Sequence, residues 1–273
     1  AAARTAEANA PSEVRTEPLP VGGNIGAYNS YWVDQGARIV DDQRTSLIVD
    51  TPDGRLPALQ PGIELDVLSL GEDLPGVRPV RVRAAGIGAD SYEDRGLSER
   101  CLLGFNSGPP IVPAGYNQNI QLFQTSDHIV ILHEMVHDAR IVPLDGRDHP
   151  SDEIGQWNGI STGHFEGDTL VVETSNLDSR VSGLQPWSLF DSAEGSGEDM
   201  TLIERFTRTG PDSLEYEVQV TDPQMYTRPW TVAFPFTRTA DLMFEYACHE
   251  GNVGMEGMLA GGRAEEAAVA GSR

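Results

Sequence analysis

The residues with the clearest chemical potential lie in one segment, where the string HExxH occurs at His133, Glu134 and His137. On an α-helix the two histidines would stand one turn apart on one face. Both could then bind a single Zn²⁺ while the glutamate activates the metal-bound water. The string therefore raises the hypothesis of a zinc-dependent hydrolase, provided that it lies on a helix.

The surroundings of this string favour a β-strand instead. A β-branched apolar run, Ile129–Leu132, leads directly into it, and such runs are typical of strands. Successive side chains of a strand point to opposite faces, so Glu134 would lie on the face opposite His133 and His137. The zinc hydrolase is therefore kept as an alternative, and we expect neither a metal nor an organic cofactor.

The same segment could perform acid–base chemistry without a metal. His137 can move a proton, Glu134 or Asp138 can orient it, and Arg140 can stabilise developing negative charge. Strand alternation places both carboxylates and Arg140 on one face and His137 on the other, unless a bulge near Asp138 re-aims the chain. Lyase, isomerase or hydrolase chemistry on a small organic molecule fits these four groups. A solvated strand end with a surface ion pair is the alternative.

Other polar and aromatic residues are candidates for binding the substrate. Tyr226, Arg228 and Trp230 are spaced by two, so on a strand they would share one face as an aromatic–arginine–aromatic ladder. The alternative for such aromatic residues is ordinary core packing. The full set of substrate-binding candidates is Tyr116, Asn117, Trp157, Tyr226, Arg228, Trp230, Glu245 and His249.

The chain contains two cysteines, Cys101 and Cys248. An even pair with neither CxxC nor metal-site spacing predicts one disulfide, which implies an oxidising compartment. In the chain-entropy model, closing so long a loop contributes about 4–5 kcal/mol to stability. Two unpaired buried thiols are the alternative. A bridge would bring the residues around Cys101 close to His249.

Composition limits the classes of partner. Lysine is absent, so all 19 basic residues are arginines, and the formal net charge is −23. Lysine Schiff-base chemistry and P-loop phosphate binding are thereby excluded, and nucleic acids and anionic membranes should be repelled. No apolar run reaches the length that spans a bilayer. We expect a small-molecule substrate or ligand, no nucleic acid and no membrane insertion, with the oligomeric state left open.

From about residue 119 onward, short strands alternate with tight turns, and no helical stretch is long enough for βαβ crossovers. This pattern predicts a mostly β fold with little helix, namely an antiparallel up-and-down barrel of the lipocalin type, with a sandwich as the alternative. We expect a loosely ordered lead over residues 1–24, one domain over 25–262 and a disordered tail over 263–273. The strands expected in the second half include 128–136, 139–144, 169–174, 214–220, 226–238 and 242–248.

Several strings, among them LSERCLLGFNSGPP, EMVHDARIVPLDGR, GDTLVVETSN, YTRPWT and YACHEGN, resemble a broad family of exported bacterial proteins of unknown function. The resemblance implies a β-rich single domain and a periplasmic or secreted location, and it assigns no reaction. In the pattern of that family the position of His133 is commonly another residue, which leaves Glu134, His137, Asp138 and Arg140 as the matching residues.

Two hypotheses of different classes follow from the sequence. The first is an exported, cofactor-independent enzyme that uses the acid–base residues above. The second is a non-catalytic carrier of an apolar small molecule. The carrier predicts an interior lined almost wholly by apolar side chains, with His137 and Arg140 outside it.

Overall fold

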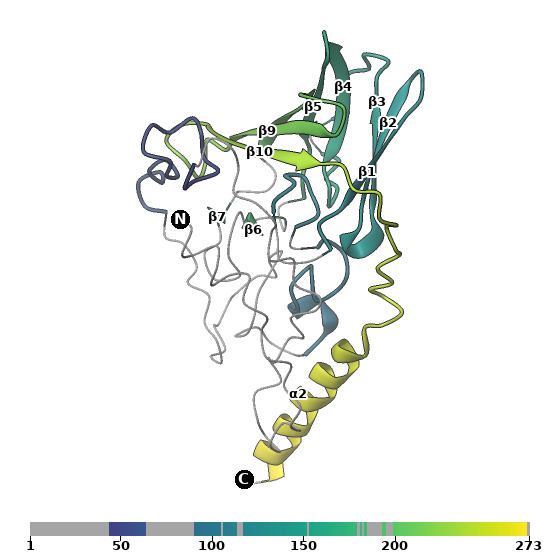
Figure 1. Cartoon of the computed structure of the whole chain (residues 1–273). Helices are drawn as coiled ribbons and strands as arrows, with labels where there is room; N and C mark the ends of the chain where they lie inside the picture. Colours follow the sequence, from purple (N-terminus) through teal and green to yellow (C-terminus); the bar gives the residue numbers. More distant parts are fainter. Residues whose placement is uncertain are drawn as a thin grey trace, which may run out of the picture.

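The computed structural model describes residues 44–63, 90–104, 106–113, 117–151, 153–178, 181, 183–184, 193–194 and 199–271. The lead over residues 1–24 and the candidate residue Tyr116 lie outside these ranges. The described part of the chain is mostly β, as the sequence predicts, and its paired strands are antiparallel (Figure 1).

A five-stranded sheet with the order β10-β9-β8-β5-β4 forms the larger half of the fold. Its strands are β4 (Ile160–Glu166), β5 (Thr169–Ser175), β8 (Thr201–Arg208), β9 (Ser213–Thr221) and β10 (Trp230–Thr237). Burial alternates along β8 and β9, which is the pattern of a sheet with one face on the core. In β9 apolar or aromatic residues occupy every second position, whereas in β8 Glu204 lies on the buried face between Leu202 and Phe206.

A three-stranded sheet with the order β1-β2-β3 forms the smaller half. Its strands are β1 (Ile120–Gln124), β2 (His128–His133) and β3 (Ala139–Pro143). The remaining described elements are the two-residue strands β6 (Gly183–Leu184) and β7 (Ala193–Glu194), the 3₁₀ turns η2 (Tyr92–Asp94) and η3 (Met135–His137), and the helix α2 (Val253–Gly271). None of the helices in the described ranges combines the length and the apolar character needed to cross a membrane.

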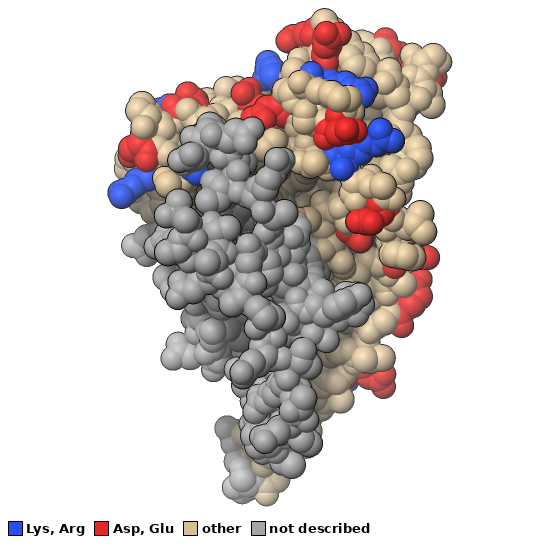
Figure 2. Space-filling model, in the orientation of Figure 1, with Lys and Arg blue, Asp and Glu red and all other residues tan. Residues whose placement is uncertain are grey.

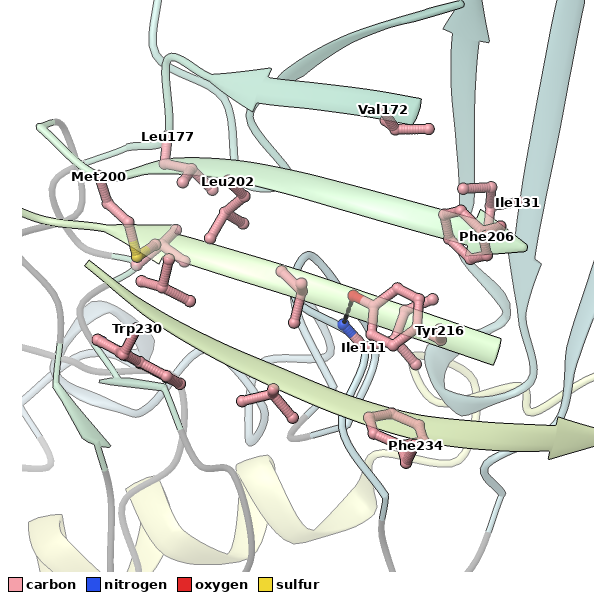
Figure 3. Close-up of a cluster of buried hydrophobic side chains, with 14 of the residues drawn as sticks. Ile111, Ile131, Val172, Leu177, Met200, Leu202, Phe206, Tyr216, Trp230 and Phe234 are labelled. Atoms are coloured by element: carbon pink, nitrogen blue, oxygen red, sulfur yellow. Dashed lines mark hydrogen bonds between the residues drawn. The ribbon is translucent and has the colours of Figure 1, made fainter. Parts of the chain in front are cut away.

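The core takes side chains from both sheets and from the loops around them. Figure 3 shows Tyr216 of β9 among Phe206, Phe234 and Ile131, and the ring centroids of Phe206 and Tyr216 are 5.0 Å apart. Strand β3 runs close to β4 because Gly163 has no side chain: a Cβ there would lie 2.8 Å from Cγ1 of Val142. No strand pairing among the described residues joins the two sheets into a closed barrel.

Four expectations differ from the structure. Strand β2 ends at His133 rather than at residue 136, and β10 begins at Trp230 rather than at 226. Residues 242–248 form no strand. The helix α2 continues to Gly271, through the stretch expected to be disordered, because its alanines and glutamates favour a helix and Oδ1 of Asn252 accepts from the backbone N–H of Met255 at 3.3 Å.

The predicted disulfide is confirmed: Cys101 is bonded to Cys248, with Cα atoms 5.7 Å apart. It joins the loop after η2 to the segment that leads into α2. The side-chain amide of Asn252 strengthens this junction by donating to the carbonyl of Glu99 at 2.7 Å. The C-terminal segment is thereby held against the body of the protein near residue 101.

Candidate active site

The HExxH string forms the turn of the β2–β3 hairpin. His133 is the last residue of β2, and the turn η3 follows, with Val136 at φ 65° and His137 at φ 53°. Two backbone hydrogen bonds close the turn, from the N–H of His133 to the carbonyl of Asp138 at 2.9 Å and from the N–H of His137 to the carbonyl of Glu134 at 3.1 Å. A zinc protease with this string requires both histidines on one face of an α-helix. In this turn His133 and His137 do not share such a face. The expected extended backbone through Val136 is also wrong.

This turn is strained, and its surroundings hold it in place. A β-branched residue in the left-handed region, such as Val136, costs about 1–3 kcal/mol. The preceding side chain, Met135, is only 4% exposed and fills the space beside Gly104, where any Cβ would collide with it. Strain of this kind persists only when packing enforces it, and it is concentrated at functional sites. Here it determines where the imidazole of His137 lies.

A cavity of about 1120 Å³ opens beside the turn. We call it the turn pocket, and residues from four parts of the chain surround it: the turn with β3, the segment 147–162, Asp178, and the region of the disulfide. It brings together five of the predicted site residues and one cysteine of the bridge, namely His137, Asp138, Arg140, Trp157, His249 and Cys101. Its other polar lining residues are Arg147, Asp148, Gln156, Asn158, Ser161, Thr162 and Asp178.

Asp138 is fixed on both of its oxygens. Oδ1 accepts from the backbone N–H of Ala139 at 2.8 Å, and Oδ2 accepts from the side-chain amide of Asn158. That contact orients the amide of Asn158, since a carboxylate can only accept from it. The other atom of this amide, Oδ1, is buried and has no hydrogen-bond partner within the described structure.

Arg140 forms a buried ion pair that links the two sheets. Its two terminal nitrogens donate to both oxygens of Glu204 on β8, with Nη2 and Oε1 2.9 Å apart, and the two residues are 5% and 0% exposed. The hydroxyl of Tyr216 also donates to Oε1 of Glu204 at 2.8 Å and accepts from the backbone N–H of Ile111 at 3.0 Å. The bond from Ile111 is drawn in Figure 3.

The electrostatics of this network follow from its burial. Burial alone would lower the pKa of Arg140, but the charge of Glu204 and the hydrogen bonds to it outweigh that effect and raise the pKa. Burial, together with the charge of Glu204, raises the pKa of Tyr216 well above its ordinary value. Arg140 therefore stays charged and Tyr216 stays protonated. Among the described residues, Nε of Arg140 has no hydrogen-bond partner.

Glu134 lies apart from the turn pocket. Its carboxylate accepts from the backbone and side-chain N–H groups of Asn119, at 3.2 and 2.8 Å, and it is not among the described residues that line the pocket. The interaction ties the turn to the start of β1. The carboxylate of Glu134 thus contacts Asn119, the residue before β1, and is not bound to the imidazole of His137.

The predicted aromatic–arginine ladder does not form, because β10 begins only at Trp230. Tyr226 and Trp230 are both 2% exposed and pack edge to face, with ring centroids 5.8 Å apart, while Arg228 is exposed near Asp50. Asn117 accepts from the side chain of Asn106 through its carbonyl, at 3.3 Å, and Glu245 is exposed. None of these residues is part of the described lining of the turn pocket.

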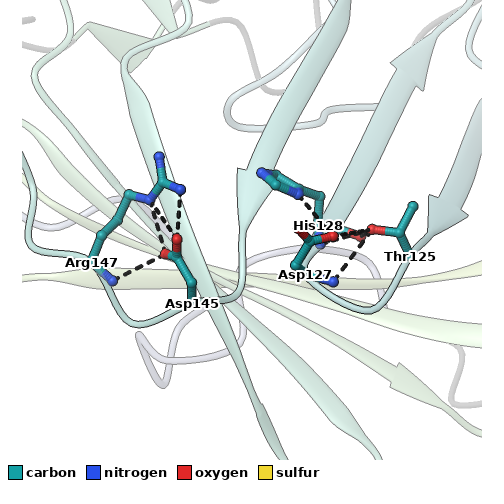
Figure 4. Close-up of polar contacts among 5 residues, drawn as sticks. All are labelled: Thr125, Asp127, His128, Asp145 and Arg147. Carbon is teal, nitrogen blue, oxygen red and sulfur yellow. Dashed lines mark hydrogen bonds and ion pairs between the residues drawn. The ribbon is translucent and has the colours of Figure 1, made fainter.

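The arginine at the entrance to the 147–162 segment is also paired. Figure 4 shows the turn where Asp145 binds Arg147, with Nη2 and Oδ2 2.6 Å apart, beside the β1–β2 turn of Thr125, Asp127 and His128. The hydrogen bond from Arg147 lowers the pKa of Asp145 to about 2. On the face shown in Figure 2, blue arginine atoms stand next to red acidic ones in the upper part of the molecule.

Sequence reasoning missed Asn158, Glu204, Tyr216 and two carboxylates of the pocket, Asp148 and Asp178. One signal was present for Glu204: it shares the buried face of β8 with Leu202 and Phe206, and a glutamate in that position needs a buried partner. The choice of Arg140 as that partner, 64 residues away in the chain, has no local signature.

Among the described residues, no group of three or more His, Cys, Asp or Glu is arranged to hold a metal ion. Comparisons with protein-family models, with curated proteins and with solved structures found no match. The geometry of the turn pocket is therefore the basis on which a function can be inferred.

Proposed function

We propose that this protein is a cofactor-independent enzyme that performs acid–base chemistry on a small organic molecule in the turn pocket. One observation carries the proposal. Within the described structure, three residues that line this pocket each carry a buried polar atom without a hydrogen-bond partner: Nδ1 of His137, Nε of Arg140 and Oδ1 of Asn158. An unpaired buried polar atom costs about 1–3 kcal/mol, and such atoms are rare in folded proteins. A bound molecule that pairs with all three recovers that cost.

In the proposal, His137 moves the proton. A neutral imidazole carries one donor and one acceptor nitrogen, so the unpaired Nδ1 can exchange a proton with a substrate that reaches it. The strained turn fixes the position of this imidazole, which spares the reaction the entropy of aligning it. Positioned acid–base groups contribute about 10²–10⁴ to a rate.

Asp138 and Arg140 provide the electrostatic surroundings. The carboxylate of Asp138 is already oriented by Asn158 and favours a positive charge forming nearby. Arg140 keeps one donor, Nε–H, for an oxygen that becomes negative, while Glu204 holds the rest of the guanidinium still. Glu134 has no role in this scheme because its carboxylate is bound to Asn119.

The reaction class is lyase, isomerase or hydrolase. In an isomerisation the imidazole takes a proton from one carbon and returns it to another, so no further reagent is needed. In an elimination the imidazole takes a proton from the carbon next to the one that bears the leaving group, the bond to the leaving group breaks, and the proton is delivered to that group. In a hydrolysis the imidazole deprotonates the attacking water, which bonds to the reacting carbon, and then gives the proton to the leaving group as its bond breaks. All three use the same residues.

A panel of aldoses, ketoses, lactones, and 4-nitrophenyl esters and glycosides tests the proposal with purified wild-type protein, with products resolved by mass. We expect at least one member to turn over, and His137→Gln to lower the rate at least about 100-fold. His164→Gln is the matched control, since His164 is exposed on β4, outside the described pocket lining. Equal rates for the His137 variant and the control would refute the role of His137.

The carrier alternative would use a second cavity of about 840 Å³, which we call the apolar pocket after Leu214, Phe234 and Phe236. Its lining also includes charged residues, among them Arg208, Asp212 and Arg238, so it is not lined almost wholly by apolar side chains. His137 and Arg140 are not part of its described lining, as the carrier hypothesis requires. A fluorescent fatty acid tests it: binding that is lost in Phe236→Ala, together with no turnover of the panel, would favour the carrier.

We also propose a periplasmic or secreted location, which the disulfide supports because such bonds persist in oxidising compartments. A lipocalin-like barrel remains our proposal for the whole fold, supported by the close approach of β3 to β4 at Gly163. An experimental structure of the full chain decides between barrel and sandwich. Strands β1 to β10 form one closed sheet in a barrel and two open sheets in a sandwich.

A further inference from the structure

The charges around the turn pocket select against anionic ligands. The lining includes the carboxylates of Asp138, Asp148 and Asp178. Its arginines in the described part of the chain are both engaged in ion pairs, Arg140 with Glu204 and Arg147 with Asp145. A ligand carboxylate would therefore meet like charges without gaining a new cation. The repulsion between two like charges at close contact is about 1 kcal/mol in water and about 4 kcal/mol near a protein surface.

The unpaired atoms call for a ligand that both donates and accepts. Nε of Arg140 can only donate, and Oδ1 of Asn158 can only accept. A hydroxyl group meets both needs, because it carries one donor and two acceptor sites. Two neighbouring hydroxyls on one ring would pair with Arg140 and Asn158 without introducing charge. Arg140 is itself 95% buried, since its exposed fraction is 5%, so these contacts are shielded from water.

Trp157 adds an apolar surface to this polar lining. It is half-buried, packs against the hydrophobic core and lines the turn pocket. An indole presents a flat apolar face, on which the C–H face of a saturated ring can stack. The volume of about 1120 Å³ is at the upper end of small-molecule sites and leaves room for more than one ring.

From these three features we infer that the turn pocket binds an uncharged polyhydroxylated ring, of the chemical class of monosaccharides and short oligosaccharides. The inference rests on the proposed function, since it names the substrate class of the same pocket. Asn158 and Arg140 contact neighbouring hydroxyls, and Trp157 covers the apolar face of the ring.

Calorimetric titration at pH 8 tests it, with glucose, galactose, mannose, xylose and the disaccharides cellobiose and maltose as probes. Glucuronate and galacturonate are the matched charged probes, because each differs from its parent sugar by a carboxylate. We expect at least one neutral sugar to bind with a millimolar or lower Kd, and its uronate to bind at least about tenfold more weakly.

Variants locate the binding. Trp157→Ala should weaken the best sugar at least about tenfold, and Asn158→Ala should weaken it about fivefold or more. Phe165→Ala, which removes an exposed aromatic ring on β4 outside the described lining, should leave Kd unchanged. Uronates that bind as tightly as the neutral sugars, or no binding by any sugar, would overturn the inference, as would a neutral sugar whose Kd is unaffected in both pocket variants.

The same titration with His137→Gln separates this inference from the proposed function. Neutral sugars that bind this variant while wild-type protein turns over nothing would leave the ligand class standing and refute the acid–base role. Turnover of esters or lactones that depends on His137, without binding of any sugar, would refute the ligand class and leave the acid–base role standing.

Discussion

The ion pair between Arg140 and Glu204 joins the two sheets. Replacing one partner should therefore remove a large part of the protein's free energy of unfolding. Glu204→Leu leaves the guanidinium of Arg140 buried without its counter-ion, and Arg140→Met leaves the carboxylate of Glu204 in the same state. Removing one partner of such a pair costs about 3–5 kcal/mol. A domain is stabilised by only about 5–15 kcal/mol in total, so either change removes a large share.

The double variant separates the ion pair from simple packing. Replacing both partners by apolar residues removes the unpaired charge, so Arg140→Met/Glu204→Leu should cost much less than the sum of the single changes. The coupling energy should therefore amount to several kcal/mol. Tyr216→Phe removes the hydroxyl that donates to Glu204 and accepts from the N–H of Ile111. It should cost at least about 1.5–3 kcal/mol, the range for the hydrogen bond to a charged group alone.

Urea unfolding followed by intrinsic fluorescence measures these free energies, with the disulfide kept oxidised throughout. Arg147→Met is the matched control, since Arg147 also forms a two-point ion pair with an acidic residue, Asp145, but at an exposed turn. We expect its unfolding free energy to equal that of the wild type within error. Single variants of the buried pair that cost less than about 1 kcal/mol, or singles whose costs simply add, would refute the reasoning.

Three further predictions concern the same structure. First, the pKa of Tyr216 is raised above its ordinary 10.0, so above about pH 10 the unfolded chain loses a proton that the folded chain keeps. The unfolding free energy should therefore fall as the pH rises above about 10. Tyr216→Phe should reduce the slope of that fall. Second, Gly104→Ala should cost about 1–3 kcal/mol in urea unfolding because its Cβ meets Met135, whereas Gly257→Ala, with open space around it, should not destabilise; equal effects would contradict the packing argument. Third, Cys101→Ser/Cys248→Ser should lose about 4–5 kcal/mol and weaken ligand binding, because His249 is no longer held at the pocket; unchanged binding would remove His249 from the site.

The sequence predicts most strands correctly because their apolar residues alternate. Ser213–Thr221 is an example in which the period-2 pattern identifies the strand, whereas Thr169–Ser175 is identified by its continuous apolar run Leu170–Val172. The turn after His133 was missed for a physical reason. Its residues favour an extended backbone locally, and the packing of Met135 against Gly104 overrides that preference.

The candidate site was predicted in part. His137, Asp138 and Arg140 lie close in the chain, so sequence spacing was enough to group them. Asn158 and Glu204 join them only through the packing of β3 against β4 and β8, which no local pattern encodes. The ladder at residues 226–230 failed because Tyr226 bridges to Leu59 instead of continuing the strand.

The most direct measurement of the central claim is a crystal structure of the His137→Gln protein soaked with the panel substrate that the wild type turns over fastest. We expect ligand density in the turn pocket, with a ligand oxygen about 2.7–3.2 Å from Nε of Arg140 and a ligand donor at Oδ1 of Asn158. Density in the apolar pocket beside Phe234 and Phe236, with Arg140 and Asn158 still unpaired, would contradict it.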